Sequence, residues 1–126
     1  MSFHLFSAEI VEIIHDEVLN PGELPGRARD KSLEGALGRV ENRLAYGMID
    51  DVFDLAATYA AVIATGHCFN DGNKRTAFRT LQTCLEFHGI ALGWNTEEIG
   101  QTIIRTAQGL TNEAELADWL RKKASA

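Results

Sequence analysis

Residues 52–65 constrain the fold more than any other part of this chain. At helical spacing their apolar side chains cover a helix most of the way round. These side chains are Val52, Leu55, Ala56, Tyr59, Ala60, Val62 and Ile63. Such a helix has almost no face for water, so other elements must surround it. Asp50 or Asp51 can begin it and Gly66 can end it. The sequence therefore predicts a central buried helix, with His67 directly after its end.

Five more helices are predicted, because amphipathic stretches alternate with helix-breaking residues along the rest of the chain. Their ranges are 8–18, 33–46, 73–88, 96–108 and 113–123. Ser7 and Ser32 are typical helix N-caps, and Asn112 with Glu115 forms a capping-box pattern before the last helix. No stretch has the alternating pattern of a convincing strand. The expected architecture is all-α: a compact six-helix bundle around a buried pair formed by the third and fourth helices.

The length and composition are those of an ordinary globular domain. The chain has 126 residues, of which 45% are apolar and 24% charged, and this favours a single domain spanning 1–126. A net charge of −6 argues against direct binding to nucleic acid, which needs clustered cations. No apolar run is long enough for a membrane helix, and residues 1–4 do not resemble a signal peptide. The two cysteines form no disulfide framework, so we expect a cytoplasmic protein with no membrane partner.

A polar loop follows the first predicted helix. Residues 20–31 contain both prolines of the chain, together with glycines that favour turns. This composition predicts a solvated loop. His15, near the end of the first helix, is expected to be a polar residue satisfied at that helix end, with a structural role near the cleft as the alternative.

The nine residues from His67 to Arg75 gather an unusual set of chemical groups. They read HCFNDGNKR and provide an imidazole, a carboxylate, two amides, a glycine and two cations. Lys74 and Arg75 lie in the first turn of the fourth helix, where the helix dipole favours negative charge. Arg79 lies one turn further on, and like charges at this spacing cost roughly a few tenths of a kcal/mol. A phosphate bound at the helix N-terminus would remove both penalties, so the stretch predicts a phosphate site.

Other residues of this stretch suit the chemistry of phosphoryl groups. Asp71 offers the oxygen ligands that Mg²⁺ prefers, Gly72 allows the backbone to approach a ligand closely, and His67 can accept a hydroxyl proton near neutral pH. A simpler interpretation is a surface turn, with Asn73 as the helix N-cap and Phe69 anchored in the core. That interpretation does not explain why the imidazole, the carboxylate and the two cations occur together.

At these residues the sequence resembles the Fic/Doc family. HCFNDGNKR is similar, at every specified position, to the family motif H-x-F-x-[DE]-[AG]-N-[GK]-R. The similarity extends to LPG at 24–26, GRVENRLAYG at 38–47 and the DLAATY run before the motif, and so covers most of the chain. The resemblance implies a six-helix Fic/Doc-like fold and an enzyme that transfers part of a nucleotide to a hydroxyl group of a protein.

Within the family, the sequence resembles most closely the Doc (death-on-curing) toxins of toxin–antitoxin systems. Doc toxins read NKR where typical Fic enzymes read NGR, and Lys74 follows the Doc pattern. Doc toxins transfer the γ-phosphate of ATP, whereas Fic enzymes attach AMP. Two positions blur this assignment, because Gly72 is the Fic choice and Cys68 replaces the proline usual in Fic. A Doc-like protein kinase is therefore predicted, with a Fic-type AMP transferase as the alternative.

The resemblance also implies roles for individual residues. His67 acts as the general base that takes the proton from a target Ser or Thr hydroxyl, and Asp71 holds Mg²⁺. Lys74 and Arg75 act with His67 as catalytic residues, because they neutralise charge on the transferring group. The residues implied to bind ATP are Asn70, Gly72, Asn73, Lys74, Arg75 and Arg79. A flap that aligns the target polypeptide is expected near residues 47–50.

Partners are implied by the resemblance alone. They are translation elongation factor Tu as the target, with inhibition of translation as the result, and an antitoxin encoded as a separate chain. Self-inhibiting Fic proteins carry an [ST]-x-x-x-E-[GN] motif, and no segment of this chain matches it. Inhibition is therefore expected to come from another protein.

The residues by themselves leave three further interpretations open. Four side chains offer possible zinc ligands: His67, Cys68, Cys84 and His88, although neighbouring ligands such as the first two are unusual in zinc sites. Cys68 can be read as a nucleophile with a histidine base. A module that keeps the fold and binds a partner without catalysis is the third interpretation.

Overall fold

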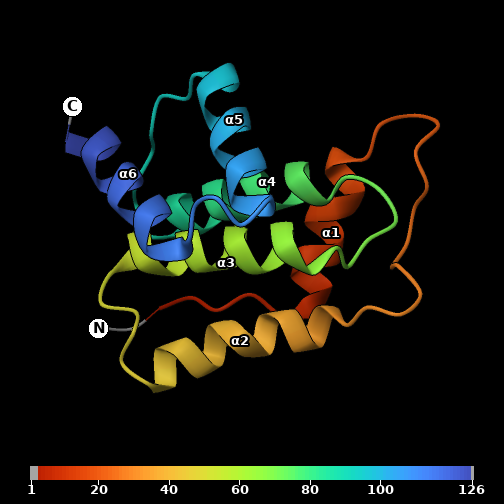
Figure 1. The fold of residues 1–126 in the computed structure, drawn as a ribbon, viewed down its shortest axis with the longest axis horizontal. Helices are drawn as coiled ribbons and strands as arrows, with labels where there is room; N and C mark the ends of the chain where they lie inside the picture. The colour runs from red at the N-terminus through yellow and green to blue at the C-terminus, as the bar shows by residue number, and fades with distance from the viewer. Residues whose placement is uncertain (1–2, 126) are drawn as a thin grey trace.

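α3 lies at the centre of the molecule, as its apolar pattern predicts. The computed structural model describes residues 3–125, in which α3 packs against α2, α4, α5 and α6, while α1 packs against α4 and α2. The helices are α1 (Ala8–Val18), α2 (Leu33–Ala45), α3 (Val52–Gly66), α4 (Asn73–Phe87), α5 (Thr96–Ala107) and α6 (Glu113–Ser125). In Figure 1, α3 runs between α2 on one side and α4 on the other. The predicted all-α, six-helix architecture is confirmed, and the predicted helix ends agree within two residues.

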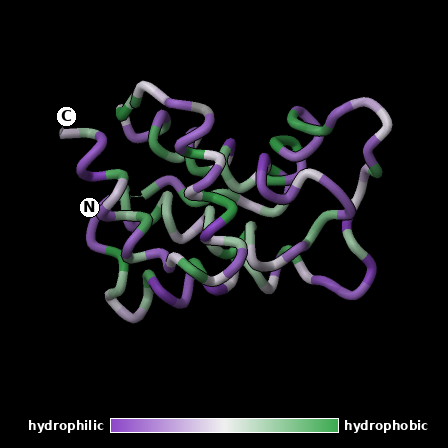
Figure 2. Tube along the Cα trace, turned by 45° about the horizontal axis from the view of Figure 1, so that its top comes forward, coloured by the Kyte–Doolittle hydropathy of each residue, from purple (hydrophilic) through white to green (hydrophobic). Residues whose placement is uncertain are grey.

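The core is built mainly on the pair α3 and α4. Residues 55–64 of α3 are all buried, and α4 contributes Ala77, Leu81, Cys84 and Leu85 to the same hydrophobic cluster. Full burial of one leucine-sized side chain contributes about 1.5–3 kcal/mol relative to exposure, so this pair forms the stable frame of the fold. Figure 2 shows hydrophobic segments in the middle of the molecule, whereas the long loop after α1 is mostly hydrophilic.

The predicted helix caps are present. Ser7, Ser32 and Asp51 each accept a hydrogen bond from the backbone N–H three residues later. Asn112 and Glu115 exchange the reciprocal hydrogen bonds of a capping box, at 2.9 and 3.2 Å. Each bond satisfies an N–H group that the helix itself leaves without an acceptor. These local bonds explain why the sequence predicts the helix starts accurately.

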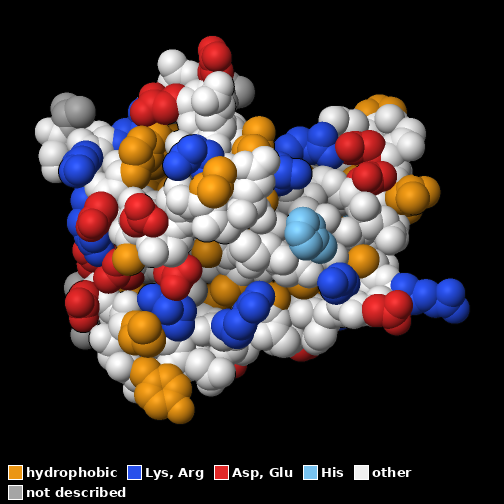
Figure 3. All heavy atoms as spheres, in the orientation of Figure 1, with side chains coloured by type: hydrophobic (Ala, Val, Ile, Leu, Met, Phe, Trp, Pro, Cys, Tyr) orange, Lys and Arg blue, Asp and Glu red, His pale blue; other side chains and the backbone are white. Residues whose placement is uncertain are grey.

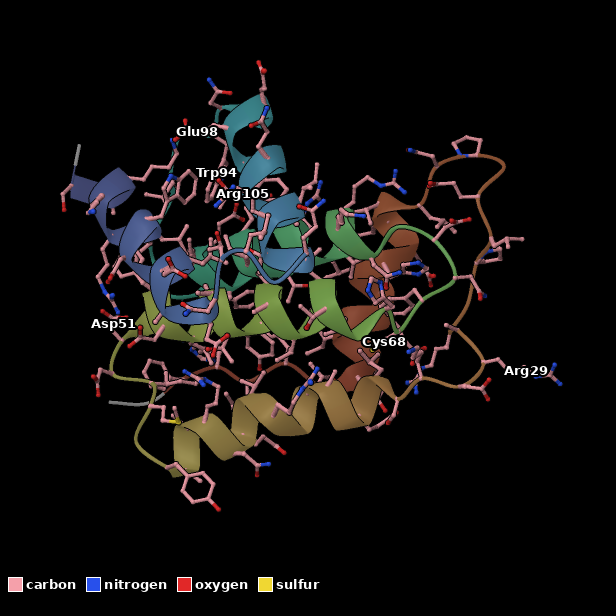
Figure 4. The ribbon with its side chains drawn as sticks, in the orientation of Figure 1. Arg29, Asp51, Cys68, Trp94, Glu98 and Arg105 are labelled. Atoms are coloured by element: carbon pink, nitrogen blue, oxygen red, sulfur yellow. The ribbon has the colours of Figure 1, made fainter. Side chains whose placement is uncertain are left out.

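The loop of residues 20–31 is mostly exposed, as predicted for a solvated loop, but its backbone also contacts the motif. Its backbone pairs with the segment after α3: Ala28 N–H donates to the Cys68 carbonyl at 2.8 Å, and Asn70 N–H donates to the Gly26 carbonyl at 3.1 Å. These bonds flank an isolated antiparallel bridge between Arg27 and Phe69. Most residues of the loop remain exposed, and Figure 4 shows the Arg29 side chain extending away from the molecule. The loop therefore covers one side of the motif.

The connector 47–50 lies far from the motif, so the expected position of a flap is wrong. The connector precedes the first turn of α3, whereas His67 follows the last turn of the same helix. At about 1.5 Å per residue, the fifteen residues of α3 separate the two by roughly 20 Å. The loop 20–31 is the segment that lies beside the motif.

Among residues 3–125, no helix combines the length and apolar character needed to cross a membrane.

Candidate active site

His67 stands at the point where the buried helix α3 ends. Its backbone has φ 49° and ψ 43°, which places a non-glycine residue in the left-handed region. This conformation costs on the order of 1 kcal/mol and persists only where the surroundings enforce it. The next two residues, Cys68 and Phe69, are buried and supply that restraint. The His67 side chain itself is exposed. Figure 3 shows Lys and Arg side chains on the surface of the molecule, interspersed with Asp and Glu side chains.

The loop after His67 is closed by Asn73. Its side-chain oxygen accepts the Phe69 N–H at 3.0 Å, and its amide nitrogen donates to the Phe69 carbonyl at 2.9 Å. Both ends of the amide are therefore used within the loop. Asn73 is not the N-cap of α4, as the surface-turn interpretation required, because Gly72 holds that position. The Asn73 side chain therefore shapes the motif loop, and its binding to ATP stays a prediction.

Asn70 also holds the loop in place. Its side-chain amide nitrogen lies within 3.0–3.4 Å of three backbone carbonyls, those of Pro25, Gly26 and Arg27. The amide donor that the sequence assigns to ATP therefore already binds the neighbouring 20–31 loop. Asn70 still lines the cavity beside His67. Its direct effect is to fix one wall of that cavity.

His15, in α1, contacts the motif loop. It is 1% exposed, its ring stacks on Phe69 at 3.9 Å between centroids with an angle of 6°, and its Nε2–H donates to the Asp71 carbonyl at 2.7 Å. The sequence favours a polar residue satisfied at a helix end over a structural role near the cleft. The structure instead makes His15 the link between α1 and the motif loop, through one apolar and one polar contact.

Replacement of His15 should destabilise the fold measurably. His15→Ala is expected to lower the free energy of unfolding by roughly 2–4 kcal/mol, because it leaves a cavity and an unpaired carbonyl. His15→Phe keeps the stacked ring and loses only the donor, so its expected cost is about 1–3 kcal/mol. Urea unfolding measures both values. If His15→Ala were as stable as the unaltered protein, His15 would not be holding the loop.

Gly72 is the N-cap of α4 and lies in the left-handed region with φ 79°. A Cβ added there would lie 3.3 Å from Arg75 Nη2 and 3.7 Å from His15 Cδ2, so the position is both strained and tight for larger residues. No side chain caps α4 at Gly72. The backbone N–H groups of its first turn are therefore available to an anion.

Asp71 is half-buried beside this helix start. Its Oδ2 accepts a hydrogen bond from the Leu24 N–H at 2.8 Å, and no bond to Oδ1 occurs among residues 3–125. One carboxylate oxygen is thus fixed by the 20–31 loop while the other remains available. A carboxylate held in this way suits Mg²⁺, which is typically bound by one or two carboxylates together with phosphate oxygens and water.

The cations near the start of α4 have different surroundings. Arg75 Nη2 lies 2.5 Å from Glu23 Oε1, and Arg79 Nη1 lies 3.9 Å from Glu17 Oε2. The sequence predicts a phosphate site because these cations repel one another at the helix start. Carboxylates from α1 and the following loop already offset part of that repulsion. Lys74 is exposed and has no acidic partner among residues 3–125. Lys74 therefore differs from Arg75 and Arg79, because no carboxylate among residues 3–125 offsets its charge at the helix start.

Glu23 forms an ion pair with Arg75, the cation that is predicted to bind ATP. The hydrogen bond from Arg75 holds the pKa of Glu23 below its ordinary value, so the carboxylate stays ionised at neutral pH. Glu23→Gln is expected to strengthen ATP binding by roughly two- to fivefold, because a neutral amide holds the guanidinium less tightly. Calorimetric titration measures the change. An equal or weaker affinity in this variant would show that Arg75 is not shared between Glu23 and the nucleotide.

A cavity of about 310 Å³ joins these groups. Its lining contains Ala64, His67, Asn70, Asp71, Gly72, Asn73, Lys74 and Arg75. The structure thus brings together every predicted site residue except Arg79, which lines neighbouring cavities on the far side of Arg75. Leu24, Glu23 and His15 belong to this site although the sequence did not assign them to it. The resemblance at LPG, residues 24–26, was the one available signal for the loop.

The two cysteines do not support the other chemical interpretations. Burial raises the pKa of the Cys68 thiol and raises that of Cys84 to about 12, so neither thiol is activated as a nucleophile. The Cys68 Sγ lies 3.6 Å from the Ser32 carbonyl, a partner typical of a structural thiol. Within residues 3–125, no three His, Cys, Asp or Glu side chains gather as a metal site. The predicted zinc alternative therefore has no ligand set in this part of the chain.

Comparison with known proteins agrees with this geometry. The sequence model of the Fic/DOC family matches residues 5–85. The chain is also 33% identical over 119 residues to "Protein kinase doc" of Escherichia phage P1, an alignment that covers 94% of each protein. The chain belongs to the Fic/DOC family. The family match ends within α4, so it includes the motif, the 20–31 loop and His15.

Proposed function

We propose that this Fic/DOC-family protein is a toxin of the Doc type, a protein kinase that transfers the γ-phosphate of ATP to a Ser or Thr hydroxyl. The observation that carries the proposal is Lys74, an unpaired cation at an uncapped helix N-terminus, lining the same cavity as the exposed His67. The kinase named in the phage relative supports the same chemistry. Such a site provides the two things that phosphoryl transfer requires, positioning and charge stabilisation.

His67 is the general base of the proposed reaction. Its imidazole is exposed at the rigid end of α3, where an incoming protein hydroxyl can reach it. His67 accepts the hydroxyl proton while the oxygen attacks the γ-phosphorus of ATP, and ADP leaves. Proton transfer by a positioned side chain contributes about 10²–10⁴-fold to a rate.

The start of α4 stabilises the transferring group. Its free backbone N–H groups and the Lys74 ammonium provide positive potential where negative charge develops. Arg75 joins them when the nucleotide displaces Glu23. Gly72 keeps the approach open, since a side chain at this position would crowd Arg75 and His15.

Asp71 is the residue proposed to hold Mg²⁺. Its geometry fits the ion, because Oδ2 is fixed by the Leu24 N–H and Oδ1 is free. Bound there, Mg²⁺ supplies charge neutralisation to the phosphate oxygens. The protein's own contribution is to hold that carboxylate at a constant place beside Gly72 and Lys74.

The biological setting is proposed from the resemblance to Doc toxins. The target is translation elongation factor Tu, the result is inhibition of translation, and a separately encoded antitoxin keeps the protein inactive. The protein is proposed to act in the cytoplasm, where ATP and such a target are available. The target need not be identified beforehand to test the chemistry of the site.

The decisive experiment labels the two ends of ATP separately. The protein is incubated with cell extract and ATP carrying label on either the α- or the γ-phosphate, and the mass gain of the modified target is measured. Transfer of the γ-label with a gain of one phosphate is expected. Transfer of the α-label with a gain of AMP would replace the proposal with the AMP transferase alternative.

A variant of the motif sharpens this experiment. Lys74→Gly removes the cation and its long side chain from the cavity, and it creates the NGR sequence typical of Fic enzymes. If Lys74 orients the nucleotide, kinase activity is lost in this variant. Full kinase activity in Lys74→Gly would assign the orientation of ATP to other residues.

A further inference from the structure

We propose that Arg27 is a positioning residue of the candidate active site, which anchors the 20–31 loop to α1 and α2 so that the loop can hold Asp71 in place. This inference rests on the proposed function, because Asp71 is the carboxylate that is proposed to bind Mg²⁺. The Arg27 backbone lies directly beside the motif, where it forms the isolated bridge with Phe69. Its side chain extends to two helices outside the motif.

The guanidinium of Arg27 joins the loop to both helices. Its Nε donates to Glu12 Oε1, in α1, at 2.9 Å, and its Nη1 donates to Glu34 Oε1, in α2, at 2.7 Å. Its Nη2 also donates to Glu12, so all three guanidinium nitrogens are used. The hydrogen bond from Arg27 holds the pKa of Glu34 below its ordinary value, and that carboxylate therefore stays ionised at neutral pH.

No other residue of the loop makes an attachment of this kind. None of residues 20–31 is buried, so apolar packing does little to hold the loop. Within residues 3–125, the other hydrogen bonds that leave the loop go to the motif itself, at Cys68, Asn70, Asp71 and Arg75. The Arg27 side chain is the attachment that ties the loop to the frame around the motif.

This attachment matters most when a ligand is bound. In the proposed mechanism the nucleotide displaces Glu23 from Arg75, so the loop loses one of its bonds to the motif. The site still needs the loop, because the Leu24 N–H donates to Asp71 Oδ2 at 2.8 Å and thereby fixes the carboxylate. Arg27 lies three residues after Leu24, and its ion pairs do not depend on the nucleotide. It can therefore keep Leu24 in place while Glu23 moves.

Arg29 provides a contrast and a matched control. It belongs to the same loop and is exposed, and among residues 3–125 its side chain has neither a hydrogen bond nor an ion pair. Figure 4 shows it extending away from the molecule. Arg29→Gln therefore makes the same change of charge as Arg27→Gln and breaks no ion pair. Arg27→Lys keeps the charge, but one ammonium group cannot reproduce the directed bonds of a guanidinium.

Amide hydrogen exchange measures the attachment directly. The Leu24 and Ala28 N–H groups bond to Asp71 and to the Cys68 carbonyl, so each exchanges when the loop opens. An arginine that joins two carboxylates contributes more than a single exposed ion pair, and we expect Arg27→Gln to speed exchange at both amides about five- to tenfold. Arg29→Gln should leave both rates unchanged, and urea unfolding shows that each variant is folded. Unchanged exchange in Arg27→Gln would overturn the inference.

The two carboxylates can be tested together. A double variant, Glu12→Gln with Glu34→Gln, is expected to speed exchange at Leu24 as much as Arg27→Gln does. Adding Arg27→Gln to the double variant should then change little, because residues that act through one network are not additive. A large further acceleration in the triple variant would mean that Arg27 acts through other groups, and would contradict the proposed attachment.

The Mg²⁺ requirement separates a positioning role from a purely structural one. The half-saturating Mg²⁺ concentration for transfer is expected to rise about two- to fivefold in Arg27→Gln, because Asp71 is held less firmly. The rate at saturating Mg²⁺ should change little, since Asp71 itself is intact. Arg27→Lys should lie between the two proteins, and Arg29→Gln should match the unaltered one. Faster exchange with an unchanged Mg²⁺ requirement would make Arg27 a structural contact alone and overturn its role at the site.

The two proposals can fail separately. If the α-label is transferred in place of the γ-label, the kinase proposal is wrong, and the Mg²⁺ comparison made on that transfer still tests Arg27. If the γ-label is transferred while exchange and the Mg²⁺ requirement are the same in Arg27→Gln and the unaltered protein, the kinase proposal stands and the role of Arg27 is wrong.

Discussion

Replacing His67 by alanine is expected to lower the rate of transfer to the target by about 10²–10⁴-fold, because the general base is removed. ATP affinity should change little, since in the proposed mechanism His67 contacts the attacking hydroxyl and α4 holds the phosphates. Single-turnover transfer of labelled phosphate measures the rate, and calorimetry measures the affinity. Near-normal transfer in His67→Ala would remove His67 from the mechanism.

The left-handed backbone at His67 requires a second variant. Alanine adopts φ 49° unwillingly, whereas asparagine tolerates this region better, so His67→Asn separates the loss of the base from a distorted loop. Both variants should be equally inactive if the imidazole matters. His4→Ala is the matched control, because His4 is an exposed histidine in the segment before α1 and is bonded through its backbone N–H to the His88 side chain.

The helices were predictable because their signals are local. Ser7, Ser32 and Asp51 each accept a hydrogen bond from a backbone amide three residues away. The cap and the helix start therefore lie within the same few residues of the sequence. The apolar pattern of residues 52–65 was equally direct, because a helix without a polar face has only a buried position available. Prediction of the fold needed no knowledge of which segments touch at long range.

The site was only partly predictable because its supports come from distant parts of the chain. Leu24 bonds Asp71 across 47 residues, Glu23 pairs with Arg75 across 52, and His15 reaches Asp71 across 56. No pattern of spacing encodes such contacts. A polar loop rich in proline and glycine reads as solvated whether or not its backbone pairs with another segment.

The same long-range contacts change the argument for a phosphate site. Two cations near a helix N-terminus, Arg75 and Arg79, have carboxylate partners in the structure, so charge repulsion no longer requires a ligand at each of them. The side-chain amide of Asn70 is hydrogen-bonded to the 20–31 loop, and that of Asn73 to the motif loop. The inference of a bound anion therefore depends on Lys74 and on the uncapped start of α4. These are fewer groups than the sequence suggested.

Removal of Mg²⁺ is expected to abolish transfer, and Asp71→Asn should reproduce most of that loss. An asparagine oxygen can still accept the Leu24 N–H, so the loop keeps its shape. The neutral amide lacks the charge that a hard cation needs, and a catalytic metal ion contributes several kcal/mol to transition-state stabilisation. We expect the rate to fall by about two orders of magnitude or more at the Mg²⁺ concentration that saturates the unaltered protein, with partial recovery at higher Mg²⁺.

Asp50→Asn provides the matched control for this change. Asp50 is an exposed aspartate before the first turn of α3, so the control alters the net charge equally at the end of the molecule away from His67. Rates are measured over a titration of Mg²⁺ in each protein, together with unfolding in urea to show that stability is unchanged. A half-saturating Mg²⁺ concentration that is higher in Asp71→Asn than in Asp50→Asn assigns the ion to Asp71. Undiminished transfer in the presence of EDTA would contradict the metal site and leave charge stabilisation to Lys74, Arg75 and the amides of α4.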